Sequence, residues 1–274
     1  MRELSLGYLT LPRASAADLV YAAGAAEVAW AGPRIAGRTA EDHGDWPAYS
    51  TSARRALGAA LRSTGVRVLD VSAMSVTAQV SVATFLPVFD CAAEVGAKVA
   101  CVSVYDPDMR RAADIVCALA QSARGFGITL GLEFVPFSQV RTLEAALAIV
   151  QRSDAADSAV IIDMMHLVRS GGRPEALQTI PRERLCFAQI CDGPARASPT
   201  IDELRQEARA ERMLPGDGAF PIDAILAALP PELPVEVEVP STQAAGLGDH
   251  DYARHAVART RSYLAARAAP DIAR

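Results

Sequence analysis

The sequence predicts an α/β protein in which strands and helices alternate along the whole chain. Eight short apolar runs have the length and composition of buried strands, and most precede a segment with apolar residues three and four positions apart. At 274 residues the chain is long for two small domains but suits one barrel with an extensive core. These observations predict a closed (β/α)8 TIM barrel, and we expect residues 1–274 to form a single domain.

The first half of the chain supplies four pairs of a strand and a helix. We expect Ser15 to cap the first helix, because a serine hydroxyl accepts a hydrogen bond from the free backbone N–H groups there. Gly65 is expected to end the second helix. The expected strands are 4–10, 27–30, 66–74 and 99–105, and the expected helices are 15–27, 53–65, 78–96 and 109–127.

The second half repeats the same alternation. A doubly wound open sheet is the alternative, but no GxGxxG pattern follows the first strand, so the barrel is favoured. A long insertion follows residue 192. The expected strands are 128–134, 158–166, 184–192 and 234–241, and the expected helices are 143–153, 174–179, 221–229 and 251–268.

Composition excludes several classes of protein. The formal net charge is -5 and no basic cluster is present, so nucleic acid is an unfavourable partner and a small molecule is expected instead. No apolar run is long enough to span a membrane and no leader begins the chain, which predicts a cytoplasmic protein; a homo-oligomer is compatible with the sequence.

The five cysteines are expected to be reduced thiols, and the one lysine, Lys98, opens a strand far from the chemistry.

The last four expected strands each close on one polar residue that carries a side-chain oxygen. These residues are Glu133, Asp163, Gln189 and Glu238. Because the carboxyl ends of parallel strands meet at one rim of a barrel, we expect the four side chains to converge there. Buried carboxylates are costly unless paired or bound to metal, so the group predicts a site for a hard divalent cation, Mg²⁺ or Mn²⁺, with Zn²⁺ as an alternative.

The eighth expected strand offers two glutamates on the same face, Glu236 and Glu238. Glu238 is the predicted ligand, because it lies nearer the carboxyl end of the strand and Pro240 follows it. Glu236 would then lie one layer deeper and would need an arginine or a hydrogen-bond partner. We also expect Asp163→Ala to abolish metal binding while leaving the barrel folded, because a ligand at the rim contributes little to an apolar core.

The segment 31–50 is too long for an ordinary link between a strand and a helix. It is polar, rich in Gly and Pro, and leaves the barrel at the predicted active rim. Its candidates for substrate contact are Trp30, His43 and Trp46. A surface loop with a packed tryptophan is the competing interpretation, and His43 is the residue that we select as a substrate contact.

The combined motifs resemble the sugar phosphate isomerase/epimerase superfamily with its xylose isomerase-like TIM barrel. The resemblance covers nearly the whole chain and is strong for family but weak for substrate. It depends on a glutamate ending the fifth expected strand, D-x-x-H in the sixth, Q-x-x-D in the seventh, R-x-x-P-G-D-G after it and a glutamate in the eighth. In this chain these motifs are Glu133, Asp163 to His166, Gln189 to Asp192, Arg212 to Gly218 and Glu238.

The resemblance implies roles for these residues. Metal would be held by the four oxygen-bearing residues, Glu133 and Glu238 would serve as catalytic base and acid, and His166 and Arg212 would contact substrate. Many family members have histidine where this chain has Gln189, and the glutamine resembles the 3-dehydroshikimate dehydratase branch. Gly216 and Gly218 are expected to form a turn, with a lid as the alternative, and Asp192 is interpreted as a helix cap.

The predicted function is a metal-dependent isomerase or epimerase acting on a sugar, sugar phosphate or polyol ketone. Its chemistry is removal of a proton beside a metal-bound carbonyl. A dehydratase of the same architecture is the alternative. A DNA-repair endonuclease of this fold would need a histidine-rich zinc cluster and a basic face for DNA, and four histidines with a net charge of -5 disfavour it. A binding barrel without catalysis is disfavoured by the complete set of four ligands.

Overall fold

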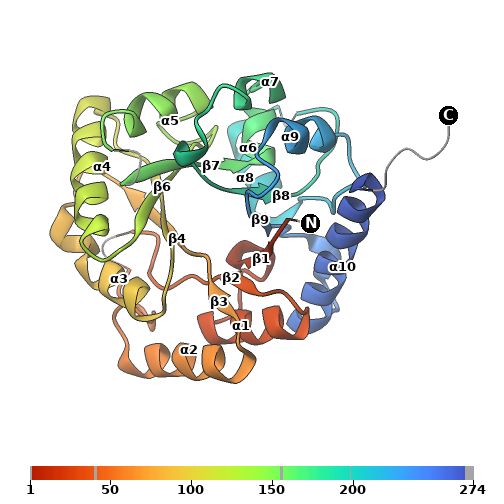
Figure 1. Cartoon of the computed structure of the whole chain (residues 1–274), viewed down its shortest axis with the longest axis horizontal. Helices are drawn as coiled ribbons and strands as arrows, with labels where there is room; N and C mark the ends of the chain where they lie inside the picture. The colour runs from red at the N-terminus through yellow and green to blue at the C-terminus, as the bar shows by residue number, and fades with distance from the viewer. Residues whose placement is uncertain (1, 40–41, 155–156, 198, 269–274) are drawn as a thin grey trace.

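Nine parallel strands form one curved sheet, with helices around its outer face (Figure 1). The computed structural model describes residues 2–39, 42–154, 157–197 and 199–268. The strand order is β3-β2-β1-β9-β8-β7-β6-β5-β4, so the sheet runs almost completely around the barrel. The predicted (β/α)8 TIM barrel is confirmed. The strands are β1 (Leu4–Gly7), β2 (Trp30–Gly32), β3 (Arg67–Val68), β4 (Asp70–Val76), β5 (Val99–Val104), β6 (Thr129–Glu133), β7 (Ser158–Asp163), β8 (Leu185–Ile190) and β9 (Val235–Val237).

The helices surround these strands. Ser15 caps the first of them, as the sequence predicts, by accepting a hydrogen bond from the backbone N–H of Asp18 at 3.1 Å. The helices are α1 (Ala16–Ala25), α2 (Thr51–Thr64), α3 (Val82–Glu94), α4 (Met109–Arg124), α5 (Leu143–Val150), α6 (Met164–Arg169), α7 (Pro174–Leu177), α8 (Ile201–Ala210), α9 (Ile222–Ala228) and α10 (Asp249–Ala268). Three short 3-10 helices are η1 (Tyr8–Thr10), η2 (Arg182–Arg184) and η3 (Thr242–Ala244).

The third expected strand, 66–74, is divided into β3 and β4. β3 pairs with β2 and β4 pairs with β5, so the sheet is open between β3 and β4, and this gap leaves β4 without a paired strand on the side of β2. The loop after β2 bridges this gap, because the backbone N–H of Ser72 donates to Pro33 O and that of Ser75 donates to Arg38 O at 2.9 Å. The loop therefore takes the place of strand pairing and is fixed to the carboxyl end of β4.

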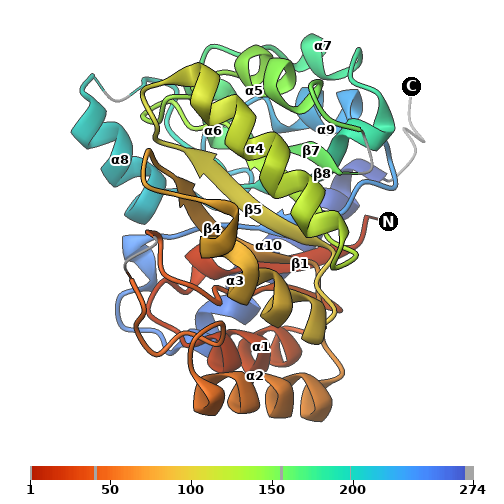
Figure 2. The ribbon, with the colours of Figure 1, turned by 90° about the vertical axis from the view of Figure 1, so that its left-hand side faces the viewer.

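The insertion after residue 192 contains a helix that the sequence analysis did not predict. Thr200 and Glu203 form a capping box at the start of α8, in which each side chain bonds to the backbone N–H of the other residue. In Figure 2, α8 lies at the end of the barrel toward which the arrows of β4 and β5 point. It therefore contributes to the carboxyl rim, where the functional residues are expected.

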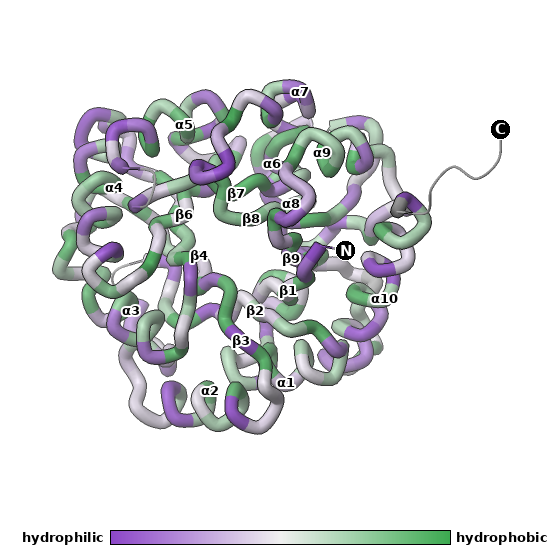
Figure 3. Tube along the Cα trace, in the orientation of Figure 1, coloured by the Kyte–Doolittle hydropathy of each residue, from purple (hydrophilic) through white to green (hydrophobic). Residues whose placement is uncertain are grey.

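Two apolar clusters account for the core. The larger one packs the outer face of the sheet against the helices, and the smaller one includes Val99, Ile161 and Phe187. Gly131 leaves space for this smaller cluster, because a Cβ atom there would lie 2.6 Å from Val99 Cγ1 and 2.8 Å from Ile161 Cδ1. Figure 3 shows hydrophobic residues along the strands and polar residues on the outward sides of the helices.

Alternation along the strands places the predicted site on the inner face of the barrel. Ile161 and Phe187 belong to the inner cluster, and residues two apart share a face. Asp163 and Gln189 follow them by two residues and are paired in register between β7 and β8. The polar site is therefore the next inner layer toward the carboxyl rim. Within the described ranges, no helix is both long and apolar enough to cross a membrane.

Candidate metal and substrate site

A cavity opens at the carboxyl rim and brings together most of the predicted site. The predicted residues that line it are Glu133, His166, Gln189, Arg212 and Glu238. Asp163 is fully buried beside them, and its carboxylate pairs with Arg212, which lines the cavity. The residues predicted from four consecutive strands therefore lie together at this rim, and their roles in metal and substrate binding stay predictions.

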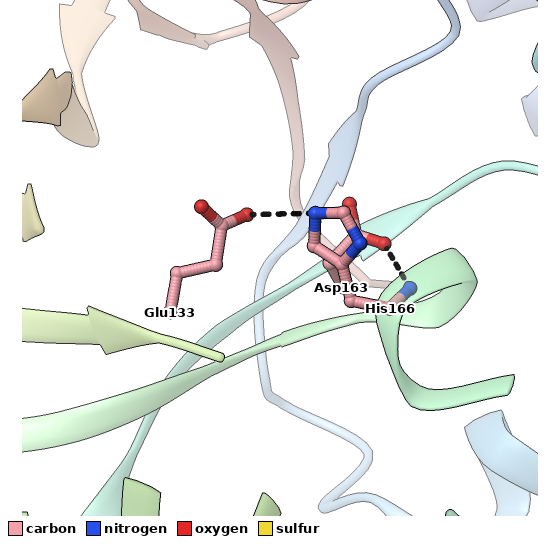
Figure 4. Close-up of side chains that lie close together, drawn as sticks. All are labelled: Glu133, Asp163 and His166. Atoms are coloured by element: carbon pink, nitrogen blue, oxygen red, sulfur yellow. Dashed lines mark hydrogen bonds and ion pairs between the residues drawn. The ribbon is translucent and has the colours of Figure 1, made fainter. Parts of the chain in front are cut away.

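Glu133, Asp163 and His166 form a group that could hold a metal. Each offers one ligand atom, and these atoms all lie within 4.8 Å of one another. Glu133 ends β6, Asp163 ends β7, and His166 lies in the first turn of α6 (Figure 4). The sequence analysis placed His166 among the substrate contacts, whereas the structure places its ring beside the carboxylates, with Nε2 3.8 Å from Glu133 Oε1.

Asp163 is held in a fixed orientation by hydrogen bonds to both of its oxygens. Oδ1 accepts from the backbone N–H of His166 at 2.8 Å, and Oδ2 accepts from Arg212 Nη1 at 2.6 Å. Burial alone would raise the pKa of Asp163, but the charge of Arg212 and these hydrogen bonds hold that pKa below its ordinary value. Each carboxylate oxygen keeps a second lone pair, so both remain able to contact a cation.

Arg212 is already engaged by two of the predicted ligands. Its Nη1 also lies 3.3 Å from Glu238 Oε2, and its Nε donates to Ala208 O at 2.9 Å. The side chain is 2% exposed, so its charge is neutralised inside the protein by Asp163 and Glu238. It lines the cavity, yet its first role is to fix the two carboxylates, and its contact with a substrate anion or hydroxyl stays a prediction.

Gln189 presents an amide oxygen that has no hydrogen-bond partner in the described part of the chain. Its Nε2 donates to Glu236 Oε1 at 3.2 Å, and Oε1 is buried and unpaired. A buried orphan oxygen next to three carboxylates is the donor set that a hard divalent cation requires. The residues present therefore fit the ion that the sequence predicts.

Glu236 has the hydrogen-bond partners that its buried position requires. Ser5 Oγ donates to its Oε2 at 3.0 Å, and Asp70 is its acidic neighbour. Gly7 and Gly32 make room for it, because a Cβ atom at Gly32 would lie 2.2 Å from Asp70 Oδ1 and 2.5 Å from Glu236 Oε2. Burial first, and then the neighbouring carboxylate, raise the pKa of Glu236 well above its ordinary value.

Asp70 was not selected from the sequence, although it is fully buried beside Glu236. Ser72 Oγ donates to its Oδ2 at 2.5 Å, and its Oδ1 finds no partner when both carboxyl groups are ionised. A proton shared with Glu236 would give Oδ1 a partner, and burial raises the pKa of Asp70. The available signal was an aspartate within an otherwise apolar expected strand.

Negative charge dominates the floor of the cavity. Burial, followed by the charges of Glu238 and Asp163, raises the pKa of Glu133 well above its ordinary value. Burial raises the pKa of Glu238 to about 7, although Arg212 opposes this change. Burial lowers the pKa of His166 to about 4, so its imidazole is neutral near pH 7. A divalent cation would relieve the repulsion among these carboxylates.

Asp192 holds the PGDG segment against the barrel. Its two oxygens accept hydrogen bonds from four backbone N–H groups at 2.8–3.0 Å, those of Gly193, Gly216, Gly218 and Phe220. Gly218 is required here, because a Cβ atom would lie 2.4 Å from both Asp192 Oδ1 and Gly193 O. Gly216 has φ of +90°, which favours glycine. Asp192 therefore anchors a turn, and it does not cap a helix as the sequence analysis proposed.

Replacing Asp192 with Asn should lower the free energy of unfolding by about 2–4 kcal/mol, because one acceptor becomes an NH₂ donor facing the N–H groups of Gly216 and Gly218. Chemical denaturation measures this change. The control is Asp217→Asn in the same turn, where the carboxylate forms only a surface pair with Arg259 and should contribute less than about 1 kcal/mol. Equal losses in the two variants would show that Asp192 is not the anchor.

Several cavity residues escaped the sequence analysis. The loop 31–50 does reach the cavity, but through Arg38, whereas His43 is exposed and packs against Tyr49 at a ring distance of 4.9 Å. Trp30 lies in the inner apolar cluster and Trp46 donates to Asp42, so neither lines the cavity. The lining residues that were missed include Tyr8, Arg38, Ser75, Ser103, Tyr105, Phe137 and Arg209.

Comparison with known proteins agrees with this fold. Residues 18–263 match the family described as xylose isomerase-like TIM barrel. The chain belongs to this family. Among solved structures, that of the IolI protein with a bound zinc atom superposes with a TM-score of 0.78 at 16% identity, covering 96% of this chain and 98% of that one.

Two curated relatives match a shorter part of the chain. A 3-dehydroshikimate dehydratase from Pseudomonas aeruginosa is 32% identical over 116 residues, which are 42% of this chain and 18% of that protein. An inosose isomerase from Bacillus subtilis is 30% identical over 118 residues, which are 42% of this chain and 40% of that protein. The chain therefore aligns with less than half of either relative.

Proposed function

We propose that the protein is a divalent-metal-dependent enzyme that removes a proton from the carbon beside a carbonyl group of a sugar-like substrate. The reaction is isomerisation or epimerisation. The observation that carries the proposal is that Glu133, Glu238 and the unpaired oxygen of Gln189 line one cavity, with Asp163 buried within 4.8 Å of Glu133. The inosose isomerase match supports the same class of reaction.

Metal binding is assigned to Glu133, Asp163, Gln189 and Glu238. A bound Mg²⁺ or Mn²⁺, or Zn²⁺, would supply Lewis-acid polarisation of the substrate carbonyl. His166 is neutral and lies 3.8 Å from Glu133, so it is able to bind a substrate hydroxyl or to enter the ligand set. Arg212 keeps Asp163 and Glu238 in place by pairing with both.

The proton transfers are assigned to Glu133 and Glu238. β7 and β8 separate the strands that carry them, so the two carboxyl groups face the cavity on either side of Asp163 and Gln189. One carboxylate takes the proton from carbon, and the other donates a proton to the neighbouring carbon or to the opposite face.

Dehydration is the second candidate, and Gln189 is the observation that favours it. Glutamine at this ligand position resembles the dehydratase branch, and the 116-residue match to a 3-dehydroshikimate dehydratase supports that resemblance. The same pair of carboxyl groups would then remove the proton from carbon and donate one to a departing β-hydroxyl. The two reactions differ only in where the second proton goes.

The test is hydrogen exchange in D₂O with the Mn²⁺-loaded protein, using a panel of ketoses, inososes and 3-dehydroshikimate. An isomerase or epimerase incorporates deuterium and keeps the elemental composition, whereas a dehydratase releases one water, and mass spectrometry separates them. Glu133→Gln should lower the exchange rate by about 10²–10⁴-fold, because it loses the proton acceptor. The control is Glu175→Gln at an exposed position; metal-independent exchange, or equal rates in the two variants, would overturn the proposal.

A further inference from the structure

Two arginines at the mouth of the cavity face the space above the acidic floor. Arg38 lies in the loop after β2 and Arg209 in the last turn of α8, and both line the cavity that contains Glu133. Arg38 is half-buried and donates from Nη2 to the hydroxyl of Tyr8 at 3.2 Å. Arg209 is exposed and lies 6.0 Å from the centre of the Phe137 ring. Segments far apart in sequence thus direct two guanidinium groups at one opening.

These arginines lack the acidic partners that their neighbours have. In the described ranges, no carboxylate lies within ion-pair distance of Arg38 or Arg209. Arg34 in the same loop has Asp42 at 3.9 Å, and Arg205 in the same helix has Asp202 at 2.8 Å. Neither positive charge at the mouth is thus neutralised by an ion pair among the described residues.

The two charges also repel each other. Burial and then the charge of Arg38 lower the pKa of Arg209. Burial alone would lower the pKa of Arg38 as well, but its neighbours Tyr8, Tyr105 and Glu133 raise that pKa. An anion placed between the two guanidinium groups would offset the repulsion on Arg209. Hydroxyl groups of Tyr8, Ser75 and Tyr105 line the same cavity and can donate further hydrogen bonds to an anion.

We propose that Arg38 and Arg209 bind an anionic group of the substrate, a carboxylate or a phosphate, while its carbonyl end lies against Glu133, Gln189 and Glu238. This inference rests on the proposed function and narrows its substrate to a hydroxylated ketone that carries a negative charge. A neutral ketose would leave both arginines unpaired. The anion contact is thus assigned to the arginines at the mouth, because Arg212 is already neutralised by Asp163 and Glu238.

Calorimetric titration with matched probes tests the inference. Shikimate should bind the Mn²⁺-loaded protein at least tenfold more tightly than its neutral methyl ester, and D-glucitol 6-phosphate more tightly than D-glucitol if phosphate is the preferred anion. Arg38→Met and Arg209→Met should each weaken binding of the charged probe about tenfold or more and leave the neutral probe unchanged. The control is Arg205→Met, which removes a paired arginine from the same helix.

Each outcome decides between the alternatives. Equal affinities for charged and neutral probes, absence of binding by every charged probe, or charge preference retained in both variants would overturn the anion site. Repeating the titration on metal-free protein separates this result from the proposed function. Charge-dependent binding without metal-dependent exchange would support the anion site and contradict the proposed function. Metal-dependent exchange with neutral ketoses that neither substitution changes would support the proposed function and contradict the anion site.

Discussion

Replacing Arg212 with Met should lower the free energy of unfolding of the metal-free protein by about 3–5 kcal/mol, because it leaves the buried carboxylates of Asp163 and Glu238 without a counter-charge. Saturating Mn²⁺ should recover part of this loss, since an ion at the site supplies the missing positive charge and stabilises the folded state by mass action. Chemical denaturation with and without Mn²⁺ measures both effects.

The control is Arg169→Met, which breaks a comparably buried pair with Glu207 outside the cavity. The Arg169→Met variant should lose a similar free energy of unfolding. Mn²⁺ should stabilise this variant no more than Mn²⁺ stabilises the wild-type protein. An equal response of the two variants to Mn²⁺ would contradict the placement of the ion beside Asp163 and Glu238. The structure also revises the expectation for Asp163→Ala, which would leave Arg212 in a buried site with one partner fewer and should reduce stability as well as metal binding.

Replacing Glu236 with Leu should weaken Mn²⁺ binding by about 10–100-fold, although Glu236 is not a predicted ligand. Glu236 Oε1 accepts the hydrogen bond from Gln189 Nε2 that leaves Gln189 Oε1 free for the cation. Leucine removes this acceptor, so the amide loses its fixed orientation and a buried N–H is left unpaired. Mn²⁺ titration monitored by electron paramagnetic resonance measures the affinity directly.

Glu236→Gln is the matched variant and should bind Mn²⁺ nearly as wild type does. The carboxylate of Asp70 favours the NH₂ group of the new amide, which directs its carbonyl oxygen at Gln189. If the Leu variant keeps wild-type affinity, or if the Gln variant is as weak as the Leu variant, Glu236 does not position Gln189.

The sequence was most informative where chemistry follows from strand alternation. Glu133 and Asp163 end β6 and β7, and Gln189 faces inward one residue before β8 ends, so an apolar run closing on an oxygen donor was sufficient to locate them. The choice between Glu236 and Glu238 followed from the same rule, and the deeper glutamate does have the hydrogen-bond partners that its burial requires. These features depend on local sequence and on the fact that the carboxyl ends of all strands in a parallel barrel meet at one rim.

What could not be predicted depends on contacts between distant segments. Arg38 reaches the cavity because its loop replaces the strand pairing between β2 and β4, and Arg209 does so because α8 lies over the rim. Nothing in the local pattern distinguishes these arginines from their neighbours Arg34 and Arg205. Likewise, the pairing of Arg212 with Asp163 joins residues 49 positions apart, and a motif alone suggested only a substrate contact.

The position of the ion tests the central claim most directly, through a crystal structure of the Mn²⁺-loaded protein with anomalous scattering. The account predicts one ion in the cavity with oxygens of Glu133, Asp163, Gln189 and Glu238 at about 2.0–2.6 Å. The rival set is Glu133, Asp163 and His166, whose ligand atoms already lie within 4.8 Å of one another. An ion bound by that set without Gln189 and Glu238, or an ion elsewhere in the protein, would contradict the account.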